Sequence, residues 1–310
     1  MHVVKLALLA FFAFATSAAA QPAPPAPPIG AELRVTTEDG VSLRVVRAGR
    51  ASDRAPLLLI SGWTVGLEAW RPVVEDLARD RLVYLLDSRS QGGSSISLTA
   101  NTPDDRARDI GLVMSRLGIS RPIVLAWSQG VQDLSAYVLA NGDSAFSGVI
   151  LVDSLPSAGA AGLAGDPAGA SRMFERLNLY RRAPADYLAG MMAAIISRPD
   201  GQAVRRQLAE IGRTTPATIG ADMLVADLYG RDRSAVRFQV PLMVIAAGGS
   251  GSQPLVRWAE ARGAAFVAID NAAHTVFVDQ PGLFLQAVQG FLRTAAPAPA
   301  GGGEGPRHDD

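Results

Sequence analysis

Short apolar runs recur along the middle of this chain and are separated by stretches of helical period. The segments 32–37 and 41–47 instead alternate apolar and polar residues on either side of Asp39-Gly40, which predicts a β-hairpin. A continuous apolar run such as 56–61 (PLLLIS) is typical of a strand that is buried on both faces. We expect further strands of this kind over 81–87, 122–126, 148–153, 241–246 and 265–269.

Segments of helical period lie between most of these strands, and we expect helices over 68–80, 104–117, 129–140, 254–262 and 282–292. Strands that alternate with helices at this spacing predict an α/β fold with a mostly parallel, eight-stranded sheet covered on both faces. The alternation stops at Ser154, and the chain then stays helical to about Arg237. We therefore expect a helical cap, inserted after strand 6, over the carboxyl ends of the strands, where such sheets bind ligands.

The two ends of the chain differ in composition from this body. A positive start, an apolar run over 6–14 and small residues before Gln21 predict a secretory signal peptide, residues 1–20, cut after Ala20. The run is too short to span about 30 Å of hydrocarbon. A Pro-rich linker (21–30) and a Gly- and Pro-rich tail (295–310) are expected to be disordered. What remains is one domain, 31–294, with its cap at about 154–237, in a protein that we expect in the periplasm or outside the cell.

Composition restricts the chemistry that this domain can perform. The 310 residues include 29 basic and 29 acidic side chains without a basic cluster, which argues against nucleic acid as a partner. The absence of cysteine excludes disulfides, thiol catalysis and thiolate metal sites. Of three histidines, His2 and His308 belong to the terminal segments, which leaves His274 as the single imidazole of the domain. We expect no metal and no cofactor, because a zinc site would lack ligands.

Ser128 follows the predicted strand 122–126 after one intervening residue, Trp127, and it directly precedes the predicted helix 129–140. A serine on a strand-to-helix turn becomes a nucleophile when a base takes its proton, and elimination leaves His274 as that base. Two alternatives involve no chemistry. Ser128 could cap the following helix, since serine is a favoured cap residue, and His274 could be a hydrogen-bonded structural imidazole.

Several motifs together resemble the α/β-hydrolase superfamily over 32–292, and within it the capped esterases and the cofactor-free non-heme chloroperoxidase-like proteins. The motifs are 61–63 (SGW), 87–94 (DSRSQGGS), 126–130 (AWSQG), 151–156 (LVDSLP), and 271–274 (NAAH) followed by 279–281 (DQP). The resemblance implies the α/β-hydrolase fold, with Ser128 as nucleophile and His274 as base. The superfamily has glycine where Ala126 stands, and alanine is small enough for the turn to form.

The third member of a catalytic triad, the acid, departs from the commonest pattern. Many relatives carry aspartate in the loop after the strand that spans 241–246 here, whereas this chain reads AGGSGSQ over 247–253. The resemblance implies Asp153, at the end of the preceding strand, which preserves the order Ser, Asp, His. Asp153 could instead only cap the start of the cap region. Asp133 is a weaker candidate for the acid. Asp270 is closer in sequence to His274 but is expected to be a strand-end residue, and Asp279 is expected to fix the histidine loop.

Acyl transfer also requires hydrogen-bond donors for the developing oxyanion. The backbone N–H of Gln129 at the head of its helix is one, and the resemblance implies the N–H of Trp63 as the other. Ser61 stands where relatives carry histidine, a position that shapes this loop. For the substrate pocket we expect Trp127 beside the serine and Tyr187 and Met191 from the cap, although tryptophan at such positions is often plain packing. Three cap arginines could be either a solvated face or a carboxylate anchor: Arg172, Arg181 and Arg182.

These residues predict an exported serine hydrolase, carboxylesterase-like, that cleaves small to medium apolar carboxylic esters, thioesters or lactones through an acyl-serine. Its partner is then a small ester-like molecule. One alternative is a cofactor-free perhydrolase or haloperoxidase on the same triad, in which peroxide replaces water. Another is a ligand-binding homologue without activity, which the missing carboxylate in 247–253 would support. Halide displacement from alkyl halides is disfavoured, because its nucleophile must be a carboxylate and Ser128 stands there.

Overall fold

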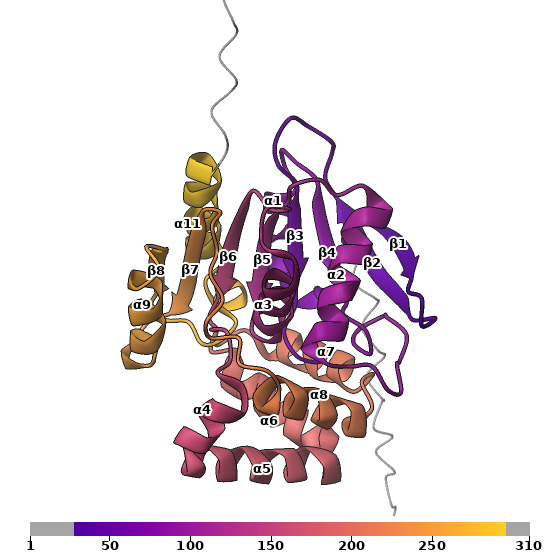
Figure 1. Ribbon diagram of the computed structural model, residues 1–310, viewed down its shortest axis with the longest axis vertical. Coiled ribbons are helices and arrows are strands. Elements are labelled where there is room, and N and C mark those ends of the chain that lie inside the picture. Colours follow the sequence, from indigo (N-terminus) through magenta and orange to yellow (C-terminus); the bar gives the residue numbers. More distant parts are fainter. Residues whose placement is uncertain (1–27, 296–310) are drawn as a thin grey trace, which may run out of the picture.

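A computed structural model describes residues 28–295 of the chain (Figure 1). Its sheet has eight strands in the order β1-β2-β4-β3-β5-β6-β7-β8. β2 is antiparallel to β1 and to β4, and all other neighbours are parallel, which confirms the predicted α/β sheet. The strands are β1 (Ala31–Thr36), β2 (Ser42–Ala48), β3 (Leu57–Ile60), β4 (Val83–Leu86), β5 (Ile123–Trp127), β6 (Gly148–Val152), β7 (Leu242–Ala247) and β8 (Ala265–Ile269).

Helices cover both faces of this sheet. Those outside the cap are η1 (Leu67–Trp70), α1 (Arg71–Leu77), α2 (Pro103–Leu117), α3 (Gln129–Asn141), η2 (Ser250–Ser252), α9 (Gln253–Glu260), α10 (Val276–Asp279) and α11 (Pro281–Ala295). Successive side chains of a strand point to opposite faces. In β3, Leu57 and Leu59 pack with α1 and α11, while Leu58 and Ile60 pack with α2 and α3. The continuous apolar runs of the sequence follow from this burial on two sides.

Two predicted helices differ from the observed ones by more than two residues at one end. The helix expected over 68–80 is divided into the 3-10 turn η1 and the α-helix α1. Proline lacks a backbone N–H and suits a first helical turn, so α1 begins at Arg71, directly before Pro72. The last helix, α11, continues to Ala295, one residue into the segment expected to be a disordered tail. The short α10 was not expected from the sequence, because four residues carry no measurable helical period.

Between β6 and β7 the chain forms the cap helices α4 (Gly159–Gly165), α5 (Pro167–Arg182), α6 (Pro184–Ile195), α7 (Gln202–Gly212) and α8 (Ala217–Tyr229). They lie over one end of the sheet, the end at which the parallel strands finish (Figure 1). Cap residues such as Tyr180 and Met192 are fully buried and belong to the same hydrophobic cluster as β5 and α11. The cap therefore packs continuously with the sheet domain.

Within residues 28–295, none of the helices is both long and apolar enough to cross a bilayer. The predicted signal peptide (1–20), the linker up to residue 27 and the tail after residue 295 lie outside the described residues.

Candidate active site

Ser128 occupies a sharp turn between β5 and α3. Its φ of 55° and ψ of −116° lie in a backbone region that residues other than glycine rarely adopt. Helix α3 approaches β3 closely after the turn, since a Cβ on Gly130 would lie 2.7 Å from the carbonyl oxygen of Ile60. The side chain of Ser128 makes no capping hydrogen bond to α3, so the helix-cap alternative is wrong. The turn instead holds Ser128 in a strained backbone conformation at the carboxyl end of β5.

His274 lies in the loop between β8 and α10, which several hydrogen bonds hold in place. Its carbonyl oxygen accepts a bond of 3.0 Å from Nε1 of Trp127. On either side of it, the N–H of Ala273 donates to Oδ2 of Asp279 at 2.8 Å, and the N–H of Thr275 donates to the carbonyl oxygen of Ile195 at 3.0 Å. The prediction that Asp279 fixes this loop is therefore confirmed. The imidazole is oriented by its own backbone and not only by its side-chain partner.

Asp153 directly follows β6 and has a positive φ of 46°. Its Oδ2 lies 2.7 Å from Nδ1 of His274, and its Oδ1 accepts the N–H of Ala247, at the end of β7, at 2.8 Å. The carboxylate thus lies between the end of the next strand and the imidazole. Of the other carboxylates considered, Asp133 pairs with Arg106 and Asp279 binds backbone N–H groups.

The loop that follows β3 abuts the turn at Ser128. A Cβ on Gly62 would lie 3.0 Å from Cβ of Ser128. Within the described part of the chain, the backbone N–H groups of Trp63 and Gln129 donate no hydrogen bond to the protein. Ser61, where relatives carry histidine, accepts a 3.1 Å bond from Nε1 of Trp70, so its hydroxyl holds the loop. The arrangement leaves two backbone donors free beside the serine.

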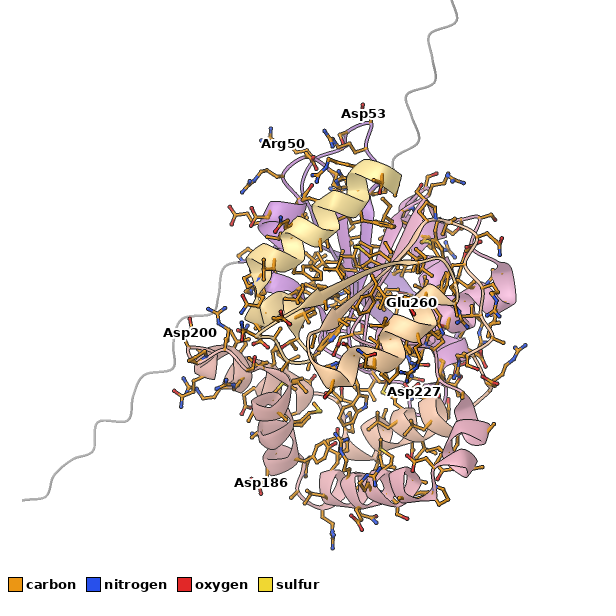
Figure 2. The ribbon with its side chains drawn as sticks, turned by 90° about the vertical axis from the view of Figure 1, so that its left-hand side faces the viewer. Arg50, Asp53, Asp186, Asp200, Asp227 and Glu260 are labelled. Atoms are coloured by element: carbon orange, nitrogen blue, oxygen red, sulfur yellow. The ribbon has the colours of Figure 1, made fainter. Side chains whose placement is uncertain are left out.

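The side chain of Gln129 belongs to a buried network that the sequence analysis missed. Its Nε2 donates to Oδ2 of Asp227 on cap helix α8 at 2.5 Å, and its Oε1 accepts from Nε2 of Gln91 at 2.9 Å. Oε1 of Gln91 in turn accepts the N–H of Thr64 in the loop after β3. Figure 2 shows Asp227 where the cap meets the sheet domain. The network joins the cap, the start of α3 and the loop that carries Trp63.

A buried arginine extends this network into the core. Arg106 on α2 is 1% exposed and pairs with two carboxylates, Asp133 at 2.7 Å and Asp227 at 2.5 Å. Burial raises the pKa of Asp133 to about 7, an effect that Arg106 opposes and the neighbouring Asp227 reinforces. The cap is thus attached to the sheet domain through one guanidinium between two acidic groups.

A cavity of about 180 Å³ separates the cap from the strand ends. Its lining includes Ser128, His274 and Trp63, the predicted pocket residues Trp127, Tyr187 and Met191, and further Val65, Met173, Arg176, Ile195 and Leu224. Nε1 of Trp63 donates to the carbonyl oxygen of Gly220 in α8 at 2.9 Å, and its ring packs edge-on against Tyr180. The lining is mostly apolar.

The cap arginines divide in a way that the sequence did not indicate. Arg172, Arg181 and Arg182 are absent from the lining, and Arg172 lies 3.8 Å from Asp166 in an exposed ion pair. Arg176, on the same helix α5, does line the cavity. Helical period is the signal that could have found it, because Arg176 lies three residues after the lining residue Met173.

Among residues 28–295, no group of three or more His, Asp or Glu side chains is arranged to hold a metal ion. The cavity itself brings together the hydroxyl of Ser128 and the imidazole of His274, which contacts Asp153.

Comparison with known proteins agrees with this fold. A family model described as alpha/beta hydrolase fold matches residues 55–281. An esterase from Thermogutta terrifontis superposes with a TM-score of 0.73 at 18% identity, covering 86% of this chain and 99% of the esterase. A protein from Pseudomonas aeruginosa described as a putative epoxide hydrolase gives 0.70 at 23% identity, covering 88% and 98%. An esterase from Rhodococcus sp. gives 0.69 at 21% identity, covering 86% and 99%. No curated protein matches the chain.

Proposed function

The chain belongs to the alpha/beta hydrolase fold family, and on that premise we propose that it is a serine hydrolase that cleaves carboxylic esters through an acyl-serine intermediate. One observation carries the proposal. Nδ1 of His274 lies 2.7 Å from Oδ2 of Asp153, while His274 and Ser128 line the same cavity. A serine hydroxyl, an imidazole and a carboxylate that bonds the imidazole are the groups that nucleophilic catalysis by serine requires.

Each residue has a definite role in the proposed reaction. Because Nδ1 of His274 is bonded to Asp153, its Nε2 is the nitrogen available to take the proton from Oγ of Ser128. The serine oxygen then adds to the ester carbonyl, and His274 returns the proton to the departing alcohol. A water molecule, deprotonated by the same imidazole, then attacks the acyl carbon; the acid is released, and the imidazolium returns the proton to Oγ of Ser128. Asp153 stabilises the imidazolium in both steps.

The negative oxygen of the tetrahedral intermediate requires donors that other groups do not occupy. We assign this role to the backbone N–H groups of Trp63 and Gln129, which bond to no acceptor within residues 28–295. The network through Gln91 and Asp227 helps to hold both donors in position, since it contacts Thr64, next to Trp63, and the side chain of Gln129.

The cavity favours a small to medium substrate. Ligand pockets typically enclose about 300–1,000 Å³, so about 180 Å³ is small. Its tryptophan, methionine and leucine walls favour apolar groups next to the ester carbonyl. Thioesters and lactones of similar size would react by the same steps.

Epoxide hydrolysis is a possibility because some of the similar structures are described as epoxide hydrolases. Opening of an epoxide by a carboxylate produces an ester that water can hydrolyse. Attack by the hydroxyl of Ser128 would produce an ether, which water does not cleave near neutral pH. The nucleophile therefore favours acyl transfer.

The proposal is tested with a fluorophosphonate probe, which labels only an activated serine. We expect labelling and ester turnover in the wild type, and neither in Ser128→Ala or His274→Ala. Absence of labelling in the wild type would favour the ligand-binding homologue. A comparison of peroxide-dependent halogenation in acetate buffer with ester turnover separates a perhydrolase from an esterase.

We also propose that the protein is exported to the periplasm or the medium, on the strength of the predicted signal peptide alone. The test is expression of the full chain in a bacterial host, followed by fractionation and mass spectrometry of the product. A mature protein that begins at Gln21 outside the cytoplasm supports export. An uncut chain in the cytoplasm contradicts it.

A further inference from the structure

We propose that the substrate carries an anionic group, a carboxylate in the simplest case, that binds Arg176 on the cap side of the cavity while the ester lies at Ser128. The inference rests on the proposed ester hydrolysis and specifies its substrate class. It begins from the lining of the cavity, which joins these two residues across the space between the cap and the strand ends.

The first observation is the charge of the lining. Arg176 is the only permanently charged residue among those that line the cavity, and no Asp or Glu from residues 28–295 accompanies it. The carboxylate of Asp153 belongs to the site but faces His274 and the end of β7, not this cavity. The apolar walls have a low dielectric constant and concentrate the field that one cation creates in the cavity. The cavity therefore favours a ligand with a negative group.

The second observation is that Arg176 has no partner. Within the described part of the chain its side chain takes part in no ion pair, hydrogen bond or ring contact. Other arginines near the site are occupied: Arg106 binds two aspartates, and Arg172 lies beside Asp166. A guanidinium presents a planar set of donors that matches both oxygens of a carboxylate. The donors of Arg176 are free to bind a ligand.

The third observation is the position of Arg176 on helix α5. This helix carries four arginines and a single acidic residue, Glu175, whereas the whole chain is balanced. Figure 1 shows α5 on the side of the cap that faces away from the sheet, whereas Ser128 lies at the end of β5. The arginine that binds the anionic group thus contacts the cavity from α5, while the ester lies at the end of β5. The substrate class that fits is a half-ester of a dicarboxylic acid, or an ester with an acidic side chain.

The experiment uses matched pairs of substrates that differ only in charge. One series consists of the monomethyl esters of linear dicarboxylic acids from malonic to adipic acid. In the other, the free carboxylate of each is replaced by a neutral carboxamide. Varying the chain length identifies the separation at which the carboxylate reaches Arg176 while the ester lies at Ser128. The readout is the ratio of kcat/KM for the half-ester to kcat/KM for its amide partner.

For the wild type we expect this ratio to reach about tenfold at the best length, mostly through a lower KM, as a charge-assisted hydrogen bond predicts. Arg176→Gln should reduce the ratio to near one, and Arg176→Lys should retain part of it. Arg181→Gln is the matched control, because it removes the same charge from the same helix outside the lining. It should change the ratio less than about twofold. Since Arg176 is exposed, the ratio should decrease as salt is added.

Three outcomes would overturn the inference, and they are distinguishable. Turnover of the amide esters with no preference for the half-esters would contradict it and leave ester hydrolysis standing. An equal loss of the ratio in Arg181→Gln would show a general effect of surface charge. Absence of turnover with every ester, together with absence of fluorophosphonate labelling, would contradict the proposed function and this inference with it.

Discussion

Asp153 contacts His274 from the end of β6, one strand before the position that the commonest pattern of the family uses. Its Oδ2 lies 2.7 Å from Nδ1 of the imidazole, and its Oδ1 binds the N–H of Ala247 at the end of β7. The loop after β7 contains no carboxylate. Because β6 and β7 are neighbouring parallel strands, an aspartate after β6 can reach the position that a carboxylate after β7 would occupy.

Replacement of Asp153 by asparagine tests this relationship. An amide can hold the imidazole in the wrong tautomer and cannot stabilise the imidazolium, so we expect kcat for ester hydrolysis to fall by about 10³–10⁴. Steady-state turnover of a simple neutral ester measures this, and thermal unfolding checks that the fold is kept.

Asp270→Asn is the matched control, because Asp270 also follows a strand and is close in sequence to His274. It should retain nearly full activity. If Asp153→Asn retains it as well, another group completes the site.

Much of this architecture could be predicted from local pattern. Continuous apolar runs indicated the buried strands, because a strand covered by helices on two faces needs apolar residues at every position. The position of Ser128 followed from the strand-to-helix turn, and elimination singled out His274. The family resemblance, not spacing, indicated Asp153. All three now lie at one end of the sheet, while their catalytic roles stay predictions.

The contacts of the cap could not be predicted in the same way. Gln129 binds Gln91 and Asp227, which lie 38 and 98 residues away in the sequence. No local period records a pairing over such distances, because it depends on how the cap docks on the sheet. The cap arginine that lines the cavity could not be predicted for a related reason. The way in which α5 docks over the cavity decides which of its arginines is part of the cavity lining.

Backbone strain at Ser128 predicts that stability and activity can be separated. Glycine adopts the conformation of Ser128 without the penalty of about 1–3 kcal/mol that other residues incur, although it loses about 0.5–1 kcal/mol through its freedom in the unfolded chain. Ser128→Gly should therefore be inactive and more stable than Ser128→Ala by about 1 kcal/mol, that is by about 2–4 °C in Tm. Calorimetry of the two inactive variants measures this. Equal Tm values would mean that the turn is not strained.

The ion pairs of Arg106 predict a large loss on removal of its cap partner. In Asp227→Ala, Arg106 keeps Asp133 as its one carboxylate partner, and the amide of Gln129 loses its acceptor. Breaking a buried ion pair from one side lowers the free energy of unfolding by about 3–5 kcal/mol. Urea denaturation measures the loss.

Asp222→Ala on the same helix α8 is the control, because Asp222 is exposed and should change stability by less than about 0.5 kcal/mol. Similar small losses in both variants would show that the buried pair contributes little to cap docking.

Asp133 predicts a pH dependence of stability. Burial raises its pKa to about 7, and its Oδ2 has no hydrogen-bond partner among the described residues, so no donor stabilises the ionised form at that oxygen. In the unfolded chain this group releases the proton near its ordinary pKa of about 3.9. Between these two values the folded protein binds the extra proton, so the contribution of Asp133 to stability is complete at low pH and is lost as pH rises through about 7.

The comparison with Asp133→Asn isolates this contribution, since asparagine does not titrate and all other groups are shared. Between pH 4 and pH 7, the wild type should lose stability relative to the variant, by at most about 1.4 kcal/mol per pH unit. Urea unfolding of both proteins across this range gives the difference at each pH. A constant difference would mean that Asp133 is ionised throughout, and that Arg106 outweighs the effect of burial on its carboxyl group.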